Sequence, residues 1–230
     1  MRTFALTILL LLASCTPNAP QHSVVRAPGS GAAKAPPADQ GGDAPRQKGW
    51  SPLHSAVEYQ DGDGSIGTTL RQPHPSLAAH FLDKGLPVDS RDEQGRTPLF
   101  LAVYHERLDL VKLFIARGAD VNARTDVQFT PLMMASISGF RDIAAYLLDH
   151  GADPRLRDDE GFTALHWAAT QHYPEIVRLL VRKGADVNAR NDVGESAVQR
   201  VQSIRIGDKG HTQEMTDSMV RLLRQLGAAD

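Results

Sequence analysis

A period of 33 residues constrains this chain more than any other feature of its sequence. Threonine recurs at this step at Thr97, Thr130 and Thr163, and glycine recurs at Gly85, Gly118, Gly151 and Gly184. A period of this length is typical of proteins that stack copies of one small unit. We therefore predict an internal repeat in which each unit is supported by its neighbours.

The sequence of each unit predicts two short helices. Thr97 and Thr130 can cap a helix through their hydroxyls, and each is followed by a proline, which suits the first helical position. A column of small residues lets neighbouring helices approach closely: Ala56, Ala102, Ala135 and Ala168. In the clearest unit we expect a second helix to begin near Pro174 and to end at Gly184, a residue that adopts the left-handed cap easily.

The signature residues of the units show a family resemblance. The segments Thr97-Pro98-Leu99 and Ala164-Leu165-His166, together with the GADVNAR tails that start at Gly118 and Gly184, resemble ankyrin repeats. The resemblance covers residues 50–230 and implies an all-α ankyrin-repeat solenoid. It implies about five stacked helix-turn-helix units with β-hairpin-like loops between them.

The first and last units are irregular. Ser51 and Thr97 lie 46 residues apart instead of 33, which predicts an insertion at about residues 60–75. The fifth unit begins at Ser196 and is expected to carry an insertion around residues 206–212, before a second helix over residues 214–226. Irregular end units are typical of caps, because an end repeat has one face without a neighbour.

The N-terminus has the features of an export signal. Residues 1–14 contain one early positive charge, an apolar run and small residues, which predicts a signal peptide. The ending before Cys15 resembles the lipobox of bacterial lipoproteins, which implies that Cys15 carries a lipid and tethers the chain to a membrane. Because Thr16 is not the aspartate that resembles an inner-membrane retention signal, we expect the outer membrane, facing the periplasm. An ordinary cleaved signal with an incidental cysteine is the alternative.

Residues 15–49 are rich in proline, alanine and glycine and contain almost no large apolar side chains. Such a segment cannot bury enough apolar surface to fold. We therefore predict a disordered linker between the lipidated cysteine and a folded domain over residues 50–230.

The sequence offers no convergent catalytic group. His54 and His166 occupy a column where the resemblance implies a structural hydrogen bond, and the other histidines lack metal-ligand spacing. The insertion beginning at Asp61 resembles the start of a calcium loop, but Ile66 and Gln72 stand where glycine and glutamate are needed, which favours a polar turn. With a formal net charge of −2, the chain has no positive electrostatic field that would attract nucleic acid. We predict no enzymatic activity, no catalytic or metal-binding residues, no cofactor and no nucleic-acid partner.

A protein-binding surface is the better prediction. In ankyrin proteins the concave surface is formed by the hairpin tips and the first helices of the repeats. Transferred column by column, the resemblance gives these candidate contact residues: Tyr59, Glu93, Arg96, Tyr104, His105, Val127, Phe129, Ile137, Glu160, Phe162, Thr170 and Val193. An exposed ridge of aromatic and aliphatic residues rimmed by carboxylates is typical of a binding hot spot. The alternative is that Phe129 and Phe162 pack against their own repeat neighbours.

Arginine also recurs along one edge, at Arg91, Arg124, Arg157 and Arg190. Such a column can bind an acidic partner, or it can form local ion pairs with the aspartates close by in the sequence.

Our first functional hypothesis is a membrane-tethered periplasmic scaffold that binds a protein partner through its concave face. Family analogy offers the role of an immunity-like or accessory factor. The alternatives are a structural envelope protein that contacts peptidoglycan or membrane components, and a cryptic hydrolase, for which the sequence supplies no nucleophile and base.

Overall fold

The computed structural model describes residues 51–58, 75–204 and 212–229. These residues form ten helices, two for each of five repeats: α2 (Pro52–Glu58) and α3 (Pro75–Asp83), α4 (Pro98–Tyr104) and α5 (Leu108–Ala116), α6 (Pro131–Ser138) and α7 (Arg141–Asp149), α8 (Ala164–Thr170) and α9 (Pro174–Arg182), α10 (Ala197–Gln202) and α11 (Gln213–Gln225). The predicted signal peptide, Cys15, the predicted linker and, apart from Pro75 and Thr212, the two predicted insertions lie outside the described residues.

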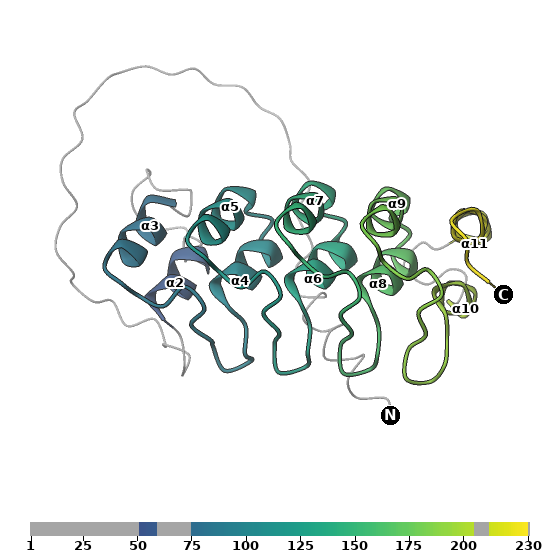
Figure 1. Ribbon diagram of the computed structural model, residues 1–230, viewed down its shortest axis with the longest axis horizontal. Helices are drawn as coiled ribbons and strands as arrows, with labels where there is room; N and C mark the ends of the chain where they lie inside the picture. Colours follow the sequence, from purple (N-terminus) through teal and green to yellow (C-terminus); the bar gives the residue numbers. More distant parts are fainter. Residues whose placement is uncertain (1–50, 59–74, 205–211, 230) are drawn as a thin grey trace, which may run out of the picture. The chain divides into compact units, whose positions relative to one another are not determined.

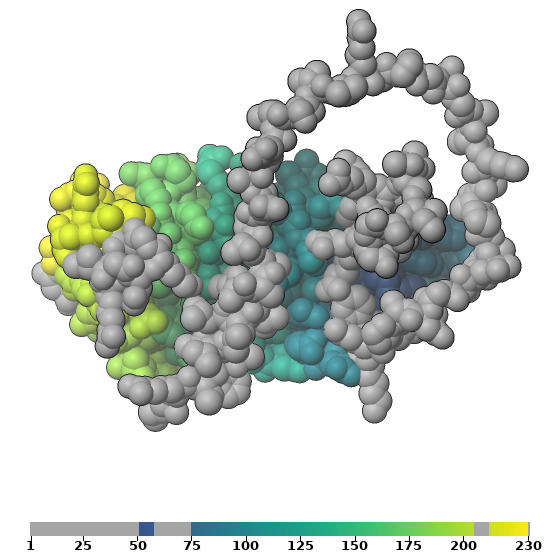
Figure 2. Space-filling model, turned by 180° about the vertical axis from the view of Figure 1, so that it is seen from behind, coloured from purple at the N-terminus to yellow at the C-terminus, as the bar shows by residue number. Residues whose placement is uncertain are grey.

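The helices form two rows (Figure 1). The inner row is α2, α4, α6, α8 and α10, the outer row is α3, α5, α7, α9 and α11, and each helix contacts its neighbours in the same row. Seen from behind, the colours change steadily along the stack, so sequence neighbours are also spatial neighbours (Figure 2). In the described ranges there is no strand, only an isolated bridge between Arg190 and Ser196. The prediction of an all-α solenoid of stacked helix-turn-helix units is confirmed.

The inner helices begin as the threonine column predicts. The Thr97 and Thr130 hydroxyls each accept a hydrogen bond, at 3.2 Å, from the amide three residues ahead. In the fourth repeat the Thr163 amide donates to Nδ1 of His166 at 3.2 Å, and the Ser51 amide donates to His54 in the same way at 3.1 Å. The histidines therefore make the structural hydrogen bonds that the resemblance implied.

The turn between the two helices of a repeat is closed by the alanine column. The amides of Arg107, Phe140 and Tyr173 donate to the carbonyls of Ala102, Ala135 and Ala168 at 2.8–2.9 Å. The outer helices end at glycines in the left-handed region, with φ of 84° at Gly118 and 92° at Gly184. The predicted glycine caps are thus present, and they turn the chain toward the next loop.

The core lies between the two rows and repeats with the sequence period. Leu99, Leu132 and Leu165 of the inner helices are at most 1% exposed, and they share the core with Phe114, Leu147 and Leu180 of the outer helices, which are fully buried. Burial of each such side chain contributes about 1.5–3 kcal/mol. This repeating core holds the loops between repeats in a fixed register.

Candidate functional site

Four hairpin-like loops, residues 91–97, 124–130, 157–163 and 190–196, project beside one another from the stack (Figure 1). We refer to them as the loop row. Each loop is closed by a backbone hydrogen bond of 3.0–3.1 Å, from Asp92 to Arg96, Thr125 to Phe129, Asp158 to Phe162 and Asn191 to Glu195. Successive loops are joined by further backbone bonds of 3.1–3.3 Å, from Asp126 to Gln94, Asp159 to Val127 and Asp192 to Glu160. The backbone of the loop row is therefore fixed before any partner is bound.

A column of short polar side chains closes each loop from inside. Its members are Asp92, Thr125, Asp158 and Asn191, each at most 8% exposed. Oδ1 of Asp158, for example, accepts the amides of Glu160 at 3.1 Å and Phe162 at 2.8 Å. From the sequence, Asp92 and Asp158 were considered only as ion-pair partners of the arginines. Short polar residues recur at this column every 33 residues, and this recurrence could have predicted that they close the loops.

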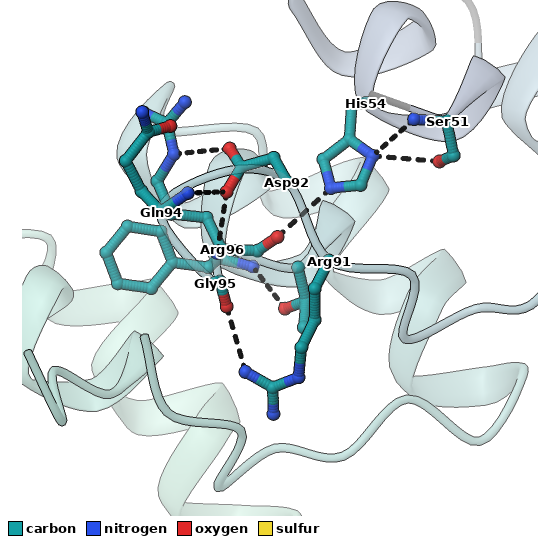
Figure 3. Close-up of polar contacts among 9 residues, drawn as sticks. Ser51, His54, Arg91, Asp92, Gln94, Gly95 and Arg96 are labelled. Carbon is teal, nitrogen blue, oxygen red and sulfur yellow. Dashed lines mark hydrogen bonds and ion pairs between the residues drawn. The ribbon is translucent and has the colours of Figure 1, made fainter. Parts of the chain in front are cut away.

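The arginine column is used within the loops. Arg91, Arg157 and Arg190 donate to the carbonyls of Gly95, Gly161 and Gly194 at 2.8–3.1 Å, and Arg124 donates to Oε1 of Gln128 at 3.0 Å. Arg157 also forms an ion pair of 2.7 Å with Asp192 of the next loop. The column therefore binds within the repeats, but among the described residues Arg157 is the one member that forms the local ion pair given as the alternative. The contact of Arg91 with the Gly95 carbonyl is visible in Figure 3.

Arg96 is also a structural residue. Its Nε lies 2.6 Å from Oδ2 of the buried Asp92, and its amide donates to Oδ1 at 2.8 Å (Figure 3). Its carbonyl lies 3.0 Å from Nε2 of His54, so it connects the first repeat to the second. The Arg96 side chain therefore neutralises a buried carboxylate, which leaves it unsuited to the role of a partner contact.

Comparison with family models then identifies the repeats. A model described as "Ankyrin repeats (3 copies)" matches residues 123–191, and a model described as "Ankyrin repeat" matches residues 94–126. The protein carries ankyrin repeats. The matched residues contain most of the loop row together with α4 to α9. Comparison with curated proteins finds no match to the chain.

The predicted aromatic ridge on these ankyrin repeats is not exposed. Phe129, Ile137 and Phe162 are only 4%, 6% and 7% exposed, so the expectation that they present an exposed ridge is wrong. The ring of Phe129 lies between Phe100, at 6.5 Å, and Trp167, at 5.6 Å. The rings of Phe129 and Phe162 both pack against Trp167 of the inner helix α8, and this aromatic packing buries them.

Trp167 of α8 is the residue that sequence reasoning missed. It is half-buried, its ring centroid lies 5.2 Å from that of Phe162, and its Nε1 donates to Oδ2 of Asp158 at 3.0 Å. Arg200 of α10 lies over the Phe162 ring at 5.5 Å. Trp167 follows directly after the Ala164-Leu165-His166 signature. The large side chain at this position could have indicated a contact with the adjoining loop.

The remaining candidates divide by exposure. Glu93 and Glu160 are exposed at the loop tips, and Val193 is 79% exposed. Tyr104, His105, Val127 and Thr170 are half-buried, with the Tyr104 and His105 rings 5.0 Å apart and the Thr170 hydroxyl donating to the His166 carbonyl at 2.7 Å. Tyr59 lies outside the described residues.

Two buried groups of this ankyrin surface, Asp158 and His166, have shifted pKa values. Burial raises the pKa of Asp158 to about 6, although the hydrogen bonds from Phe162, Trp167 and Glu160 act in the opposite direction. Burial lowers the pKa of His166, so its imidazole is neutral at pH 7. Within residues 51–58, 75–204 and 212–229, no group of three or more His, Cys, Asp or Glu side chains could hold a metal ion. In the same residues no helix has the length and apolar character needed to cross a membrane.

Proposed function

We propose that this protein is a scaffold that binds a protein partner along its loop row and the adjoining inner helices. Ankyrin repeats generally mediate binding between proteins, and this chain carries at least the repeats over residues 94–191. The observation that supports the surface most is the backbone ladder that joins the four loops. A surface that is ordered before binding loses little conformational entropy on association.

The exposed side chains of the loop row indicate the chemistry of the partner. Five exposed carboxylates lie on it: Glu93, Asp126, Asp159, Glu160 and Asp192. The arginines of the same loops are engaged by loop carbonyls and side chains. A basic segment of the partner fits such a surface, because complementary charge accelerates association and disfavours acidic proteins.

The test is capture of partners from the native source by the full chain, with the bound proteins identified by mass spectrometry. In the tip variant Glu93→Lys, Asp159→Lys and Glu160→Lys are combined, and we expect loss of the captured partner. The matched control, with Asp142→Lys, Glu175→Lys and Asp217→Lys, reverses three exposed carboxylates of the outer helices. We expect it to retain the partner. Equal retention by both variants, with unchanged thermal unfolding, would place binding elsewhere.

The membrane tether belongs to the same proposal and is supported by the sequence of residues 1–15 alone. In this view Cys15 carries lipid and holds the repeats on the periplasmic side of the outer membrane. The full chain and its Cys15→Ala variant are expressed with a labelled fatty acid and fractionated. Label in the membrane fraction with the native chain, and none with the variant, is the expected result. Equal labelling of the two chains refutes the tether.

The role of an immunity-like or accessory factor is the most specific part of the proposal. It is tested by the identity of the captured protein. A secreted toxin or a periplasmic enzyme supports it, whereas capture of wall or membrane components alone supports the structural alternative.

A further inference from the structure

Asp158 is a buried carboxylate held by neutral donors. Its Oδ1 accepts two backbone amides, from Glu160 at 3.1 Å and Phe162 at 2.8 Å, and its Oδ2 accepts the indole N–H of Trp167 at 3.0 Å. The residue is 8% exposed. In the described part of the chain, no basic side chain forms an ion pair with it, whereas the equivalent Asp92 is paired with Arg96 at 2.6 Å.

The titratable and charged groups on the loop and on the elements beside it are Arg157, Asp159 and Glu160 of the loop itself, His166 of α8, Arg124 and Asp126 of the preceding loop, Arg190, Asp192 and Glu195 of the following loop, and Arg200 of α10. The four arginines are directed elsewhere: Arg124 to Gln128, Arg157 to Gly161 and Asp192, Arg190 to Gly194 and Gln199, and Arg200 to the ring of Phe162. Asp159 raises the pKa of Asp158 further, in the same direction as burial. None of the four guanidinium groups therefore offsets the burial of Asp158 through an ion pair.

We propose that the hydrogen bond between Asp158 and Trp167 is a pH-sensitive switch that holds Trp167 firmly against the loop row in neutral solution and less firmly in acid. A proton taken from solvent binds to Oδ2, because Oδ1 already accepts two backbone amides. Protonation removes the negative charge of the carboxyl group, and a neutral hydroxyl oxygen accepts the indole N–H more weakly than a carboxylate oxygen does, so the hydrogen bond weakens. Oδ1 keeps both amides, and the loop stays closed.

Loosening of Trp167 alters the surface used in the proposed function, since Trp167 is half-buried on an inner helix and its ring contacts those of Phe129 and Phe162. The inference rests on the proposed function only where it links the state of Trp167 to partner binding. The switch itself is measured on the free protein, so its failure and the failure of partner binding are distinguishable.

The test follows the indole N–H of Trp167 by proton–nitrogen correlation NMR in the full chain carrying Trp50→Phe. The chain has two tryptophans, so this background leaves Trp167 as the only indole. We expect its signal to move upfield on acidification with a midpoint at about pH 6. In Asp158→Asn the signal should stay at one position over the same range. Asn191 closes its own loop by accepting the Glu195 amide at 2.8 Å, so the loop tolerates asparagine at this column.

His166 requires a control because it precedes Trp167 and also titrates below its ordinary pKa. In His166→Gln the cap is expected to persist, since Gln199 accepts the Ser196 amide at 2.9 Å in the fifth repeat. The Trp167 titration should persist in His166→Gln, and in Asp159→Asn it should move to lower pH. Loss of the titration in His166→Gln, or its retention in Asp158→Asn, overturns the switch.

A second readout is quenching of Trp167 fluorescence by acrylamide, a neutral probe. We expect greater quenching at pH 5 than at pH 7.5 in the Trp50→Phe chain. Asp158→Asn should give the greater quenching at both values. Equal quenching of the Trp50→Phe chain at pH 5 and pH 7.5 shows that the indole is not loosened in acid, and it contradicts the proposal.

Discussion

The loops of the second and fourth repeats have the same backbone and differ in how they treat a buried carboxylate. In both, an arginine donates to a glycine carbonyl at the tip and an aspartate accepts two amides. Asp92 is then neutralised by Arg96, whereas Asp158 is bound by the uncharged indole of Trp167. One backbone hydrogen-bonding pattern therefore supports two electrostatic states. The two residues that decide between them are Arg96, which closes the turn just before the helix cap, and Trp167, which lies on the following inner helix.

The largest expected effect comes from removing the cation of the second-repeat loop. Arg96→Met leaves the Asp92 carboxylate buried without its partner, which should lower the free energy of unfolding by about 3 kcal/mol. Urea unfolding of the full chain measures the change. The double variant Asp92→Asn with Arg96→Met should recover most of the loss, because asparagine closes the fifth-repeat loop. A loss below about 1 kcal/mol for Arg96→Met would remove the electrostatic distinction between the two loops.

The second prediction concerns how the unfolding free energy depends on pH through Asp158 in the fourth-repeat loop. Asp158 has a pKa of about 6 in the folded chain and an ordinary value of 3.8, so the folded state keeps a proton that the unfolded state has lost. The contribution of Asp158 to the unfolding free energy should therefore be largest below pH 3.8, and it should fall by about 3 kcal/mol as pH rises through 6.

Asp158→Asn isolates this contribution. The difference in unfolding free energy between native chain and variant, measured at intervals from pH 4 to 7, should change over that range and level off above it. Asp159→Asn is the matched control, with an exposed carboxyl, and should preserve most of the slope. A difference that is constant with pH contradicts the assignment to Asp158.

Glycine substitutions test how tightly neighbouring loops are packed. A Cβ at Gly161 would lie 2.7 Å from the Asp192 amide of the next loop, at φ +80°, whereas a Cβ at Gly151, at φ +94°, would meet nothing within 4 Å. Both Gly→Ala changes impose backbone strain of about 1 kcal/mol. Gly161→Ala should cost about 2 kcal/mol more, because it also pushes two loops apart. Thermal unfolding of the two variants measures the difference, and equal losses would show that the loops separate easily.

The smallest expected effect is at the third-repeat loop, where Gln128 replaces the glycine at φ 59°. Gln128→Gly relieves the left-handed strain but removes the hydrogen bond from Arg124. We expect a net gain of about 0.5 kcal/mol in unfolding free energy. Differential scanning calorimetry against the native chain checks it, and a clear loss would mean that the Arg124 bond contributes more than the strain.

Much of the fold could be predicted from residues that act locally. Thr97 and Thr130 cap helices, Gly118 and Gly184 end them, and the period of the apolar residues sets the two rows, because these effects depend on neighbours a few positions away. A local ion pair was one of the two alternatives for the arginine column, and it is present at Arg157, whereas Arg91 binds the Gly95 carbonyl instead.

The candidate surface was predicted less well. Val193 and Glu160 are exposed as expected, but Phe129, Phe162 and Ile137 are buried, and Trp167 was overlooked. A column in a repeat has the same backbone in each unit, yet its exposure depends on which side chains the adjoining repeats place against it. Phe129 of the third repeat, for example, is covered by Trp167 of the fourth.

The sequence by itself determined the repeat, the helix boundaries and the left-handed caps, because each depends on hydrogen bonds and dihedral angles within one unit. Only the tertiary structure decided which side chains face solvent and which carboxylate has a cation beside it. Asp92 and Asp158 occupy the same column, and their charge environments differ because burial and pairing arise between elements that the chain brings together only on folding.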